Sequence, residues 1–176
     1  MDHDHQHTHT TTPNLPITHP TFKDYIPLLS VFAVIIFATL AVCSKVSFTP
    51  DTVLGYSMGF FFLIFGLFKL LDIGMFAMGY REYDLIAKNI PAWGYIYPFL
   101  EIGLAGLYLA GDTSANTLYI TIALSAITVV SVWIKLAKRE LVQCVCLGNV
   151  LRVPLTYVSL VEYAAMAAMA IAMLVI

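Results

Sequence analysis

The amino-acid sequence predicts an all-α integral membrane protein, folded as a bundle of about five transmembrane helices. Of its 176 residues, 60% are hydrophobic and 11% are charged, whereas soluble domains average about 45–50% apolar and about 25% charged residues. The apolar residues also gather in runs long enough to cross about 30 Å of hydrocarbon. The formal net charge is −2, and no basic cluster is large enough to indicate nucleic-acid binding.

Residues 1–22 are expected to form a disordered tail before a membrane domain of residues 23–176. The tail is polar, with a run of threonines and several prolines, and it has few apolar side chains to bury. It shows neither the basic segment nor the immediate apolar run of a signal sequence, so the first span is expected to direct insertion. The predicted spans are residues 25–44, 53–73, 91–111, 117–134 and 154–175.

A short polar connection separates the first two spans. The first span carries no charged side chain and is long enough to cross the membrane as a helix. In the second span, Gly55 and Gly59 form a GxxxG pair, which permits close contact with a neighbouring helix. Residues 72–90 are moderately apolar and turn polar near their end. This pattern predicts a helical extension of the second span, followed by an interfacial segment.

The remaining three spans differ in their side chains. The third begins with Trp93, Tyr95 and Tyr97, which suit a membrane interface, and its Pro98 indicates a kink. The fourth is followed by a basic cluster. The fifth has a small-residue face that suits tight packing against another helix, formed by Ala164, Ala165, Ala167 and Ala168.

Lysine and arginine side chains predict the orientation of the bundle. With five spans, the N-terminal tail, the second loop and the fourth loop share one side of the membrane. Only Lys45 falls on the other side, which indicates a cytoplasmic N-terminus in a bacterial-type inner membrane. If one apolar run is re-entrant, the chain has four spans and the fourth loop changes sides. The basic residues on the first side are Lys23, Arg81, Lys88, Lys135, Lys138, Arg139 and Arg152.

Two of the three cysteines, Cys144 and Cys146, lie one residue apart between the fourth and fifth spans. Such a pair can cycle between dithiol and disulfide, or it can share a soft metal ion. The nearby Lys138 and Arg139 favour the thiolate form. Alternatively, both cysteines are small apolar residues near the membrane boundary. Cys43 stands alone at the far end of the first span, where a structural role is the better interpretation.

Four charged residues lie within or beside the apolar runs. Lys69 and Asp72 are three residues apart and share a face if one helix contains both, although Lys69 could instead snorkel to the lipid boundary. Glu101 and Glu162 lie well inside spans, where an unpaired charge is costly, so both are expected to face the bundle interior. Lys69, Glu162 and the cysteine loop share one half of the membrane. A carboxylate there could accept a thiol proton, or a Lys–Glu pair could be purely structural.

Histidines in the tail and the two loop cysteines are candidate ligands for Cu or Zn. The first three residues offer an amine, two backbone amides and an imidazole, an order that suits Cu(II) or Ni(II). The other imidazoles could add weak sites, and thiolates suit Cu(I) or Zn. The tail could instead be merely soluble, or an expression artefact. The candidate metal ligands are His3, His5, His7, His9, Cys144 and Cys146.

Several stretches of residues 53–176 together resemble the MauE/DoxX-like family of redox-associated membrane proteins. They are FGLFKLLD at 65–72, YDLIAK at 83–88, YPFLEIGLAGLYL at 97–109, QCVCLG at 143–148 and VPLTYVSLVEY at 153–163. The resemblance implies a small multi-span protein connected with thiol redox chemistry, and for the MauE members with maturation of methylamine dehydrogenase, where disulfides are made. Related chains often carry a heavy-metal-associated domain before the membrane part, where this sequence has the His-rich tail.

Three functions are compatible with these features. In the leading hypothesis, Cys144 and Cys146 exchange disulfides with a thioredoxin-like partner, as a non-classical thiol-disulfide oxidoreductase component. Cytoplasmic thiols are normally reduced, which favours a second hypothesis, a metal-handling or transport protein served by a metal carrier. In the third, the chain is a structural subunit of a membrane complex. Membrane lipid is an expected partner in each case, and a homo-oligomer is compatible with all three.

Overall fold

The computed structural model describes residues 26–138 and 156–175, and within these two ranges the chain consists of helices joined by short turns and loops. Five of the helices coincide, within a few residues at each end, with the five apolar runs. A sixth, shorter helix follows the second run. The helices are α1 (Ile26–Cys43), α2 (Pro50–Leu71), α3 (Ile73–Tyr83), α4 (Ala92–Leu109), α5 (Ala115–Ala137) and α6 (Thr156–Val175).

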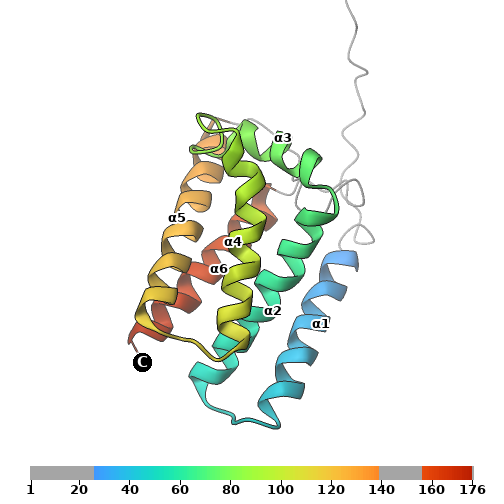
Figure 1. Cartoon of the computed structure of the whole chain (residues 1–176), viewed down its shortest axis with the longest axis vertical. Coiled ribbons are helices and arrows are strands. Elements are labelled where there is room, and N and C mark those ends of the chain that lie inside the picture. Colours follow the sequence, from blue (N-terminus) through green and yellow to red (C-terminus); the bar gives the residue numbers. More distant parts are fainter. Residues whose placement is uncertain (1–25, 139–155, 176) are drawn as a thin grey trace, which may run out of the picture.

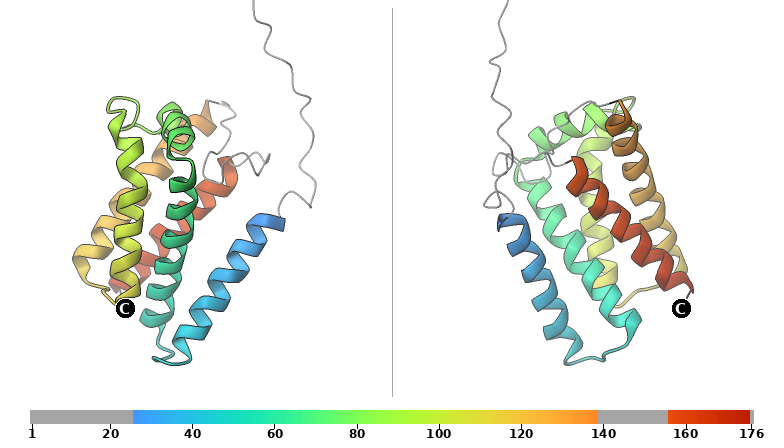
Figure 2. Two further views of the ribbon diagram at one scale, coloured as in Figure 1. Left: turned by 45° about the vertical axis from the view of Figure 1, so that its right-hand side comes forward. Right: turned by 180° about the vertical axis from the view of Figure 1, so that it is seen from behind.

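The five longer helices run roughly along one axis, and α3 lies across one end of the bundle (Figure 1). Helix α2 packs against α1 on one side and α4 on the other, while α5 packs along α6. Figure 2 shows the same arrangement from two other sides, with α1 at the edge of the bundle. The end of the bundle that carries α3 is called the α3 end below. The opposite end carries the α1–α2 and α4–α5 connections (Figure 1).

The expected extension of the second span is a separate helix. The backbone leaves the helical region at Asp72, with φ −140° and ψ 68°, and α3 begins at the next residue. The Asp72 carboxylate accepts a hydrogen bond from the Met75 N–H at 3.0 Å, which satisfies one of the free N–H groups at the start of α3. Asp72 therefore ends one helix and caps the next, and the corner turns α3 across the bundle.

Small residues bring α2 and α4 close together. A Cβ atom at Gly59 would lie 2.9 Å from the Leu109 side chain, and one at Gly66 would lie 2.9 Å from the Ile102 side chain. Such close approach requires the absence of a side chain. The alanine face expected in the last span does not make comparable contacts, because Ala164, Ala165 and Ala168 are exposed. Helix α6 packs instead mainly through larger side chains, among them Tyr163, Met166 and Met173, together with Ala170.

Within the described ranges, the buried side chains form two clusters of different character. The larger cluster joins α1, α2, α4, α5 and α6 and consists mostly of Phe, Leu and Met side chains. The smaller one lies under α3, where aromatic side chains dominate: Phe76, Tyr80, Tyr83 and Tyr97 with Ala87 and Val132. The α3 end is therefore the more polar part of the interior.

Helices α2 and α5 are each long and apolar enough to cross a membrane. Shorter apolar stretches occur at residues 28–43 and 162–175. Many apolar side chains point outward, and Phe37 of α1 is 76% exposed. An apolar exterior of this kind is typical of helices in contact with lipid. Among the described residues, two helices thus meet the criteria for a span, while crossings by the other three apolar runs stay a prediction.

Candidate functional site

A buried ion pair lies between α2 and α4 near the α3 end. The Lys69 ammonium donates a hydrogen bond to the Glu101 carboxylate, and each residue is only 1% exposed. Lys69 sits in the last turn of α2, and Glu101 sits midway along α4. Removing both charges from water is costly unless each finds a partner. The pair accordingly joins the two helices at a specific position.

Aromatic rings from three helices surround the ammonium group. The Lys69 nitrogen lies 5.5 Å from the centre of the Phe76 ring, 5.1 Å from that of Tyr97 and 5.5 Å from that of Tyr163. It also donates a hydrogen bond to the Tyr163 hydroxyl at 2.9 Å. Ring faces attract a cation most strongly where water is absent. The ammonium is therefore stabilised by the carboxylate, by a phenol oxygen and by three rings.

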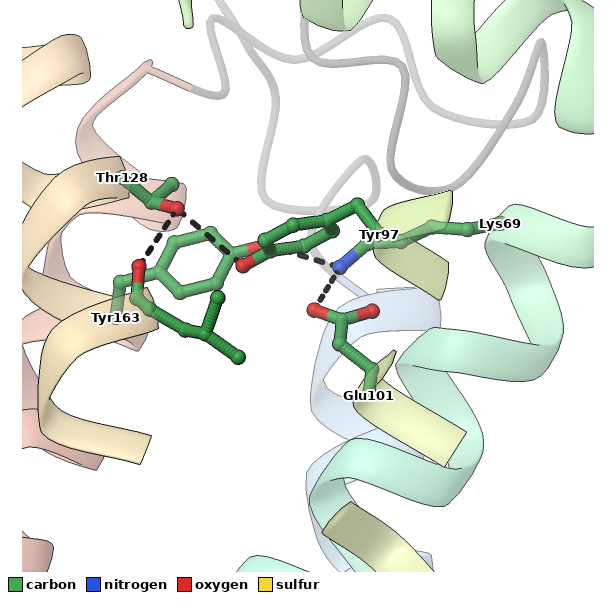
Figure 3. A network of polar contacts seen from close by, with 6 residues as sticks. Lys69, Tyr97, Glu101, Thr128 and Tyr163 are labelled. Carbon is green, nitrogen blue, oxygen red and sulfur yellow. Dashed lines mark hydrogen bonds and ion pairs between the residues drawn. The ribbon is translucent and has the colours of Figure 1, made fainter. Parts of the chain in front are cut away.

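A row of hydroxyl groups on α5 meets this site. Thr128 donates to the carbonyl of Leu124 at 3.2 Å, and its oxygen lies 3.3 Å from the Tyr97 hydroxyl, which can donate to it. Figure 3 shows these side chains converging on the ion pair from four helices. We call Lys69, Tyr97, Glu101, Thr128 and Tyr163 the polar cluster. The buried hydroxyl residues of α5 are Thr117, Thr121, Ser125, Thr128 and Ser131.

Asp84 connects the row to the α3 end. Its carboxylate accepts hydrogen bonds from the N–H groups of Ile86 and Ala87, at 3.0 and 2.8 Å, and from the Ser131 hydroxyl at 3.4 Å. Asp84 is buried, but it begins a turn whose other residues include exposed side chains. The turn therefore brings a carboxylate to the hydroxyl row just beneath the surface.

Tyr80 lies between Asp84 and the polar cluster. Its ring centre is 4.9 Å from that of Tyr97, and its hydroxyl is close to the side chains of Thr128 and Asp84. The hydroxyl nevertheless reaches hydrogen-bond geometry with no group among the described residues. Burial raises the pKa of Tyr80 well above its ordinary value, and the nearby Tyr97 and Asp84 raise it further. The phenol consequently keeps its proton and can both donate and accept.

One oxygen of Glu101 is also without a partner. Lys69 binds Oε1, whereas Oε2 is buried and makes no hydrogen bond within the described part of the chain. A candidate donor is the Tyr163 hydroxyl, which binds the same Lys69 ammonium as Glu101. A buried polar group without a partner is costly and uncommon. Glu101 therefore retains one position for a further hydrogen-bond donor or for a proton.

The sequence-predicted charged residues reach different places in the structure. Glu101 and Glu162 are both buried, at 1% and 7% exposure. The described ion pair of Lys69 is with Glu101. Asp72 faces the backbone of α3 instead of sharing a helix face with Lys69, because the helix breaks there. Cys43 is buried at the end of α1, and its thiol forms no disulfide with another described residue.

The candidate thiol and metal ligands lie outside the described residues. This applies to Cys144 and Cys146 and to all four candidate histidines of the tail. Within residues 26–138 and 156–175, no group of three or more His, Cys, Asp or Glu side chains could hold a metal ion. The metal hypothesis therefore rests on the sequence pattern alone.

The aromatic part of the site does not follow from the sequence prediction. The sequence favours a membrane interface for Tyr97, but this residue is 2% exposed and lies against Lys69. Its spacing of four residues from Glu101 places both on one face of α4, and this signal could have found it. The three- and four-residue spacing of Ser and Thr along α5 likewise predicts a polar helix face.

Comparison with known protein families gives a match. A family described as "Methylamine utilisation protein MauE" matches residues 47–176. The match covers most of the chain, including the whole polar cluster and the segment that contains Cys144 and Cys146. No curated protein and no solved structure matches the chain. The DoxX-like side of the sequence resemblance stays a prediction. The family match over well more than half of its length shows that the chain belongs to the MauE family.

Proposed function

We propose that the chain is a multi-pass inner-membrane protein that supports methylamine utilisation by exchanging disulfides with a partner protein through Cys144 and Cys146. Family membership is the observation that carries the proposal, since the match at residues 47–176 includes both cysteines and its description names methylamine utilisation. We further propose five spans, formed by α1, α2, α4, α5 and α6, with the N-terminus in the cytoplasm. Helix α3 then lies near the cytoplasmic boundary.

The helix ends adjoining the thiol segment support a site at the α3 end. Helix α5 ends at Ala137 and α6 begins at Thr156, and both of these helix ends lie at the α3 end (Figure 1). Tyr163 follows the start of α6 by seven residues, about 10 Å along the helix axis. A partner that docks at this end would reach the thiols without entering the membrane.

Disulfide exchange would proceed in two steps. A thiolate of the chain attacks a sulfur of the partner disulfide, which forms a mixed disulfide and releases the partner's other sulfur as a thiolate that takes up a proton. The second cysteine then attacks the mixed disulfide, closes the Cys144–Cys146 disulfide and releases the reduced partner. Two electrons pass from the chain to the partner. The same steps in reverse deliver a disulfide to a maturing partner.

Trapping the mixed disulfide tests this function. Cys144→Ser and Cys146→Ser each remove one attacking group, so one of the two variants should accumulate a covalent adduct with a thioredoxin-like protein. The adduct should disappear on reduction. Cys43→Ser is the matched control, because Cys43 is buried at the opposite end of the bundle, and it should trap nothing.

Absence of an adduct from both single variants would contradict disulfide exchange. If the reduced wild-type protein then binds Cu(I) or Zn, and both single variants lose that binding, the thiols serve a metal site. If the double Ser variant still supports growth on methylamine, the thiols are dispensable and the chain acts as a structural subunit.

The side of the membrane on which Cys144 and Cys146 lie is tested by an impermeant thiol reagent, applied to intact cells and to inverted vesicles. The proposed topology predicts labelling of Cys144 and Cys146 in inverted vesicles only. Labelling from outside intact cells would overturn the cytoplasmic orientation and place the thiols in the compartment where disulfides persist.

A further inference from the structure

The polar groups of the α3 end form a nearly continuous row from Asp84 to Glu101. Tyr80 lies close to both Asp84 and Thr128, and the Thr128 oxygen lies 3.3 Å from the Tyr97 hydroxyl. The Lys69 ammonium lies 5.1 Å from the centre of the Tyr97 ring and donates hydrogen bonds to both the Tyr163 hydroxyl and the Glu101 carboxylate, so Tyr97, Tyr163 and Glu101 meet around it. The members of the row are Asp84, Tyr80, Thr128, Tyr97, Tyr163 and Glu101.

The row is closed to solvent but its two ends differ. Asp84 begins an exposed turn beneath the surface of the α3 end, whereas Glu101 lies midway along α4. Tyr80 Oη and Glu101 Oε2 are the polar atoms of this row that have no hydrogen-bond partner among the described residues. Each can accept one more hydrogen. A hydroxyl between them can receive a proton on its oxygen and pass on its own, as general acid–base groups do.

The surroundings of Lys69 suit an ammonium whose counter-ion is sometimes neutral. A buried ammonium has three N–H groups, so one carboxylate oxygen alone does not satisfy it. Here Phe76, Tyr97 and Tyr163 present ring faces to it, and the Tyr163 oxygen accepts one of its hydrogens. These contacts remain when Glu101 loses its charge. Among the described residues, the titratable groups around Glu101 besides Lys69 include Tyr97 on its own helix and Tyr163 on α6, with Tyr80 and Asp84 farther along the row.

We propose that Glu101 is a proton-binding site inside the bundle and that it exchanges its proton with the α3 end through Tyr80, Thr128, Tyr97 and Tyr163. Uptake converts the Glu101 carboxylate to a carboxylic acid with the proton on Oε2. Each hydroxyl of the row gains one proton and gives one away, so none is left charged. The Thr128 hydroxyl can rotate so that it donates to Tyr97 and no longer to the Leu124 carbonyl. The hydrogen bond between Thr128 and Tyr97 then points in the direction in which a proton moves to Glu101. The proposal does not depend on the cysteines.

Infrared difference spectroscopy of the full-length protein in lipid nanodiscs tests the site. Lowering the pH should produce the carbonyl stretch of a buried protonated carboxyl group, at a higher wavenumber than the stretches of solvent-exposed carboxyl groups, and this band should shift in D2O. Glu101→Gln should abolish it, whereas Glu162→Gln, which alters another buried glutamate, should retain it. A band that survives Glu101→Gln overturns the proposal. If Glu101→Gln does not fold, Glu101→Asp must move the band, and an unmoved band also overturns the proposal.

The route is tested by the rate at which the band appears after a pH jump. Tyr97→Phe removes a hydroxyl of the row. The band should then appear about tenfold more slowly or slower still, with its final amplitude unchanged. Tyr108→Phe is the matched control, since Tyr108 is also buried on α4 and bonds a threonine of α5 in the other half of the bundle. It should leave the rate unchanged. Equal rates in the two variants would exclude the route through Tyr97.

Discussion

Tyr97 and Tyr108 make the same kind of contact in opposite halves of the bundle, yet the groups that surround them differ. Both lie on α4 and are at most 2% exposed, and each meets a threonine of α5: Thr128 at 3.3 Å and Thr121 at 2.8 Å. Tyr108 stacks on the Phe62 ring within the apolar cluster. Tyr97 instead lies beside an ammonium group, a carboxylate and two further tyrosines.

The difference comes from the elements that approach each tyrosine. Near Tyr108, α2 presents the Phe62 ring, so the hydroxyl pair is a local clamp between α4 and α5 in apolar surroundings. Near Tyr97, α2 presents Lys69, and the corner at Asp72 brings α3 with Phe76 across the end. An identical pair of side chains is therefore a clamp in one half and a member of a charged network in the other.

The largest expected effect comes from breaking the ion pair. Glu101→Leu leaves Lys69 as a buried, uncompensated charge and should cost about 3–5 kcal/mol of stability. The double variant Lys69→Met/Glu101→Leu should recover most of this loss, because neither charge remains. Unfolding in detergent, followed by circular dichroism, measures both. A double variant no more stable than Glu101→Leu would show that the network, and not the isolated charge, determines stability.

Glycine substitutions compare how tightly the two halves are packed. A Cβ at Gly94 would lie 3.0 Å from the Ala77 backbone, which has no rotamer to change, while one at Gly59 meets chiefly the Leu109 side chain. Gly94→Ala should therefore cost more than Gly59→Ala, both within about 1–3 kcal/mol. Gly103→Ala is the control, because nothing lies within 4 Å of its Cβ position. Its helix should gain about 0.5–1 kcal/mol. A larger loss of stability for Gly59→Ala than for Gly94→Ala would show that the apolar half is the more tightly packed.

Removing the hydroxyl of Tyr108 or of Tyr97 should change the stability by a smaller amount. Tyr108→Phe should cost about 1 kcal/mol, and Tyr97→Phe should cost less, because its bond to threonine is longer. Both threonines keep a backbone carbonyl as acceptor after the substitution. Thermal unfolding of the two variants side by side provides the measurement. A larger loss for Tyr97→Phe would mean that the hydroxyl also supports the Lys69–Glu101 pair.

The smallest effect is expected at the loop of the opposite end. Hydrogen bonds from Ser114 and Thr117 lower the pKa of the exposed Asp112. Since the folded state favours the carboxylate, its contribution is present above the unfolded pKa of about 4 and is lost as the pH falls through the lowered value. Asp112→Asn should reduce the decline of the melting temperature in that acidic range. An unchanged decline would assign acid sensitivity to carboxylates elsewhere.

The positions of the helices along the chain can be predicted from the sequence more readily than the breaks between them or the rotation of each helix about its axis. Apolar runs mark helix positions because the composition changes sharply at each end, and the predicted run 91–111 contains α4 (Ala92–Leu109). The corner at Asp72 does not follow from the sequence, since an aspartate after a leucine pair fits an interfacial helix as well as a cap. Only the side-chain bond to Met75 distinguishes them.

The carboxylate that pairs with Lys69 cannot be predicted from the sequence either, because the pairing depends on the three-dimensional arrangement of the helices. Depth along each span places Lys69 within reach of more than one carboxylate. Which one pairs depends on how α2, α4 and α6 are rotated, and that rotation follows from contacts such as Gly66 against Ile102. The burial of Glu101 and Glu162 could be anticipated, because a lipid-facing carboxylate is costly.

The ion pair joins residues that are synthesised at different times. Lys69 is synthesised 32 residues before Glu101 and 94 residues before Tyr163. During synthesis, α2 therefore meets the insertion machinery with a lysine whose counter-ion has not yet been made. Its place in the last turn of α2 lets the long side chain extend to the polar boundary in the meantime. The ammonium can move inward once α4 delivers the carboxylate, and its aromatic enclosure is completed only when α6 arrives.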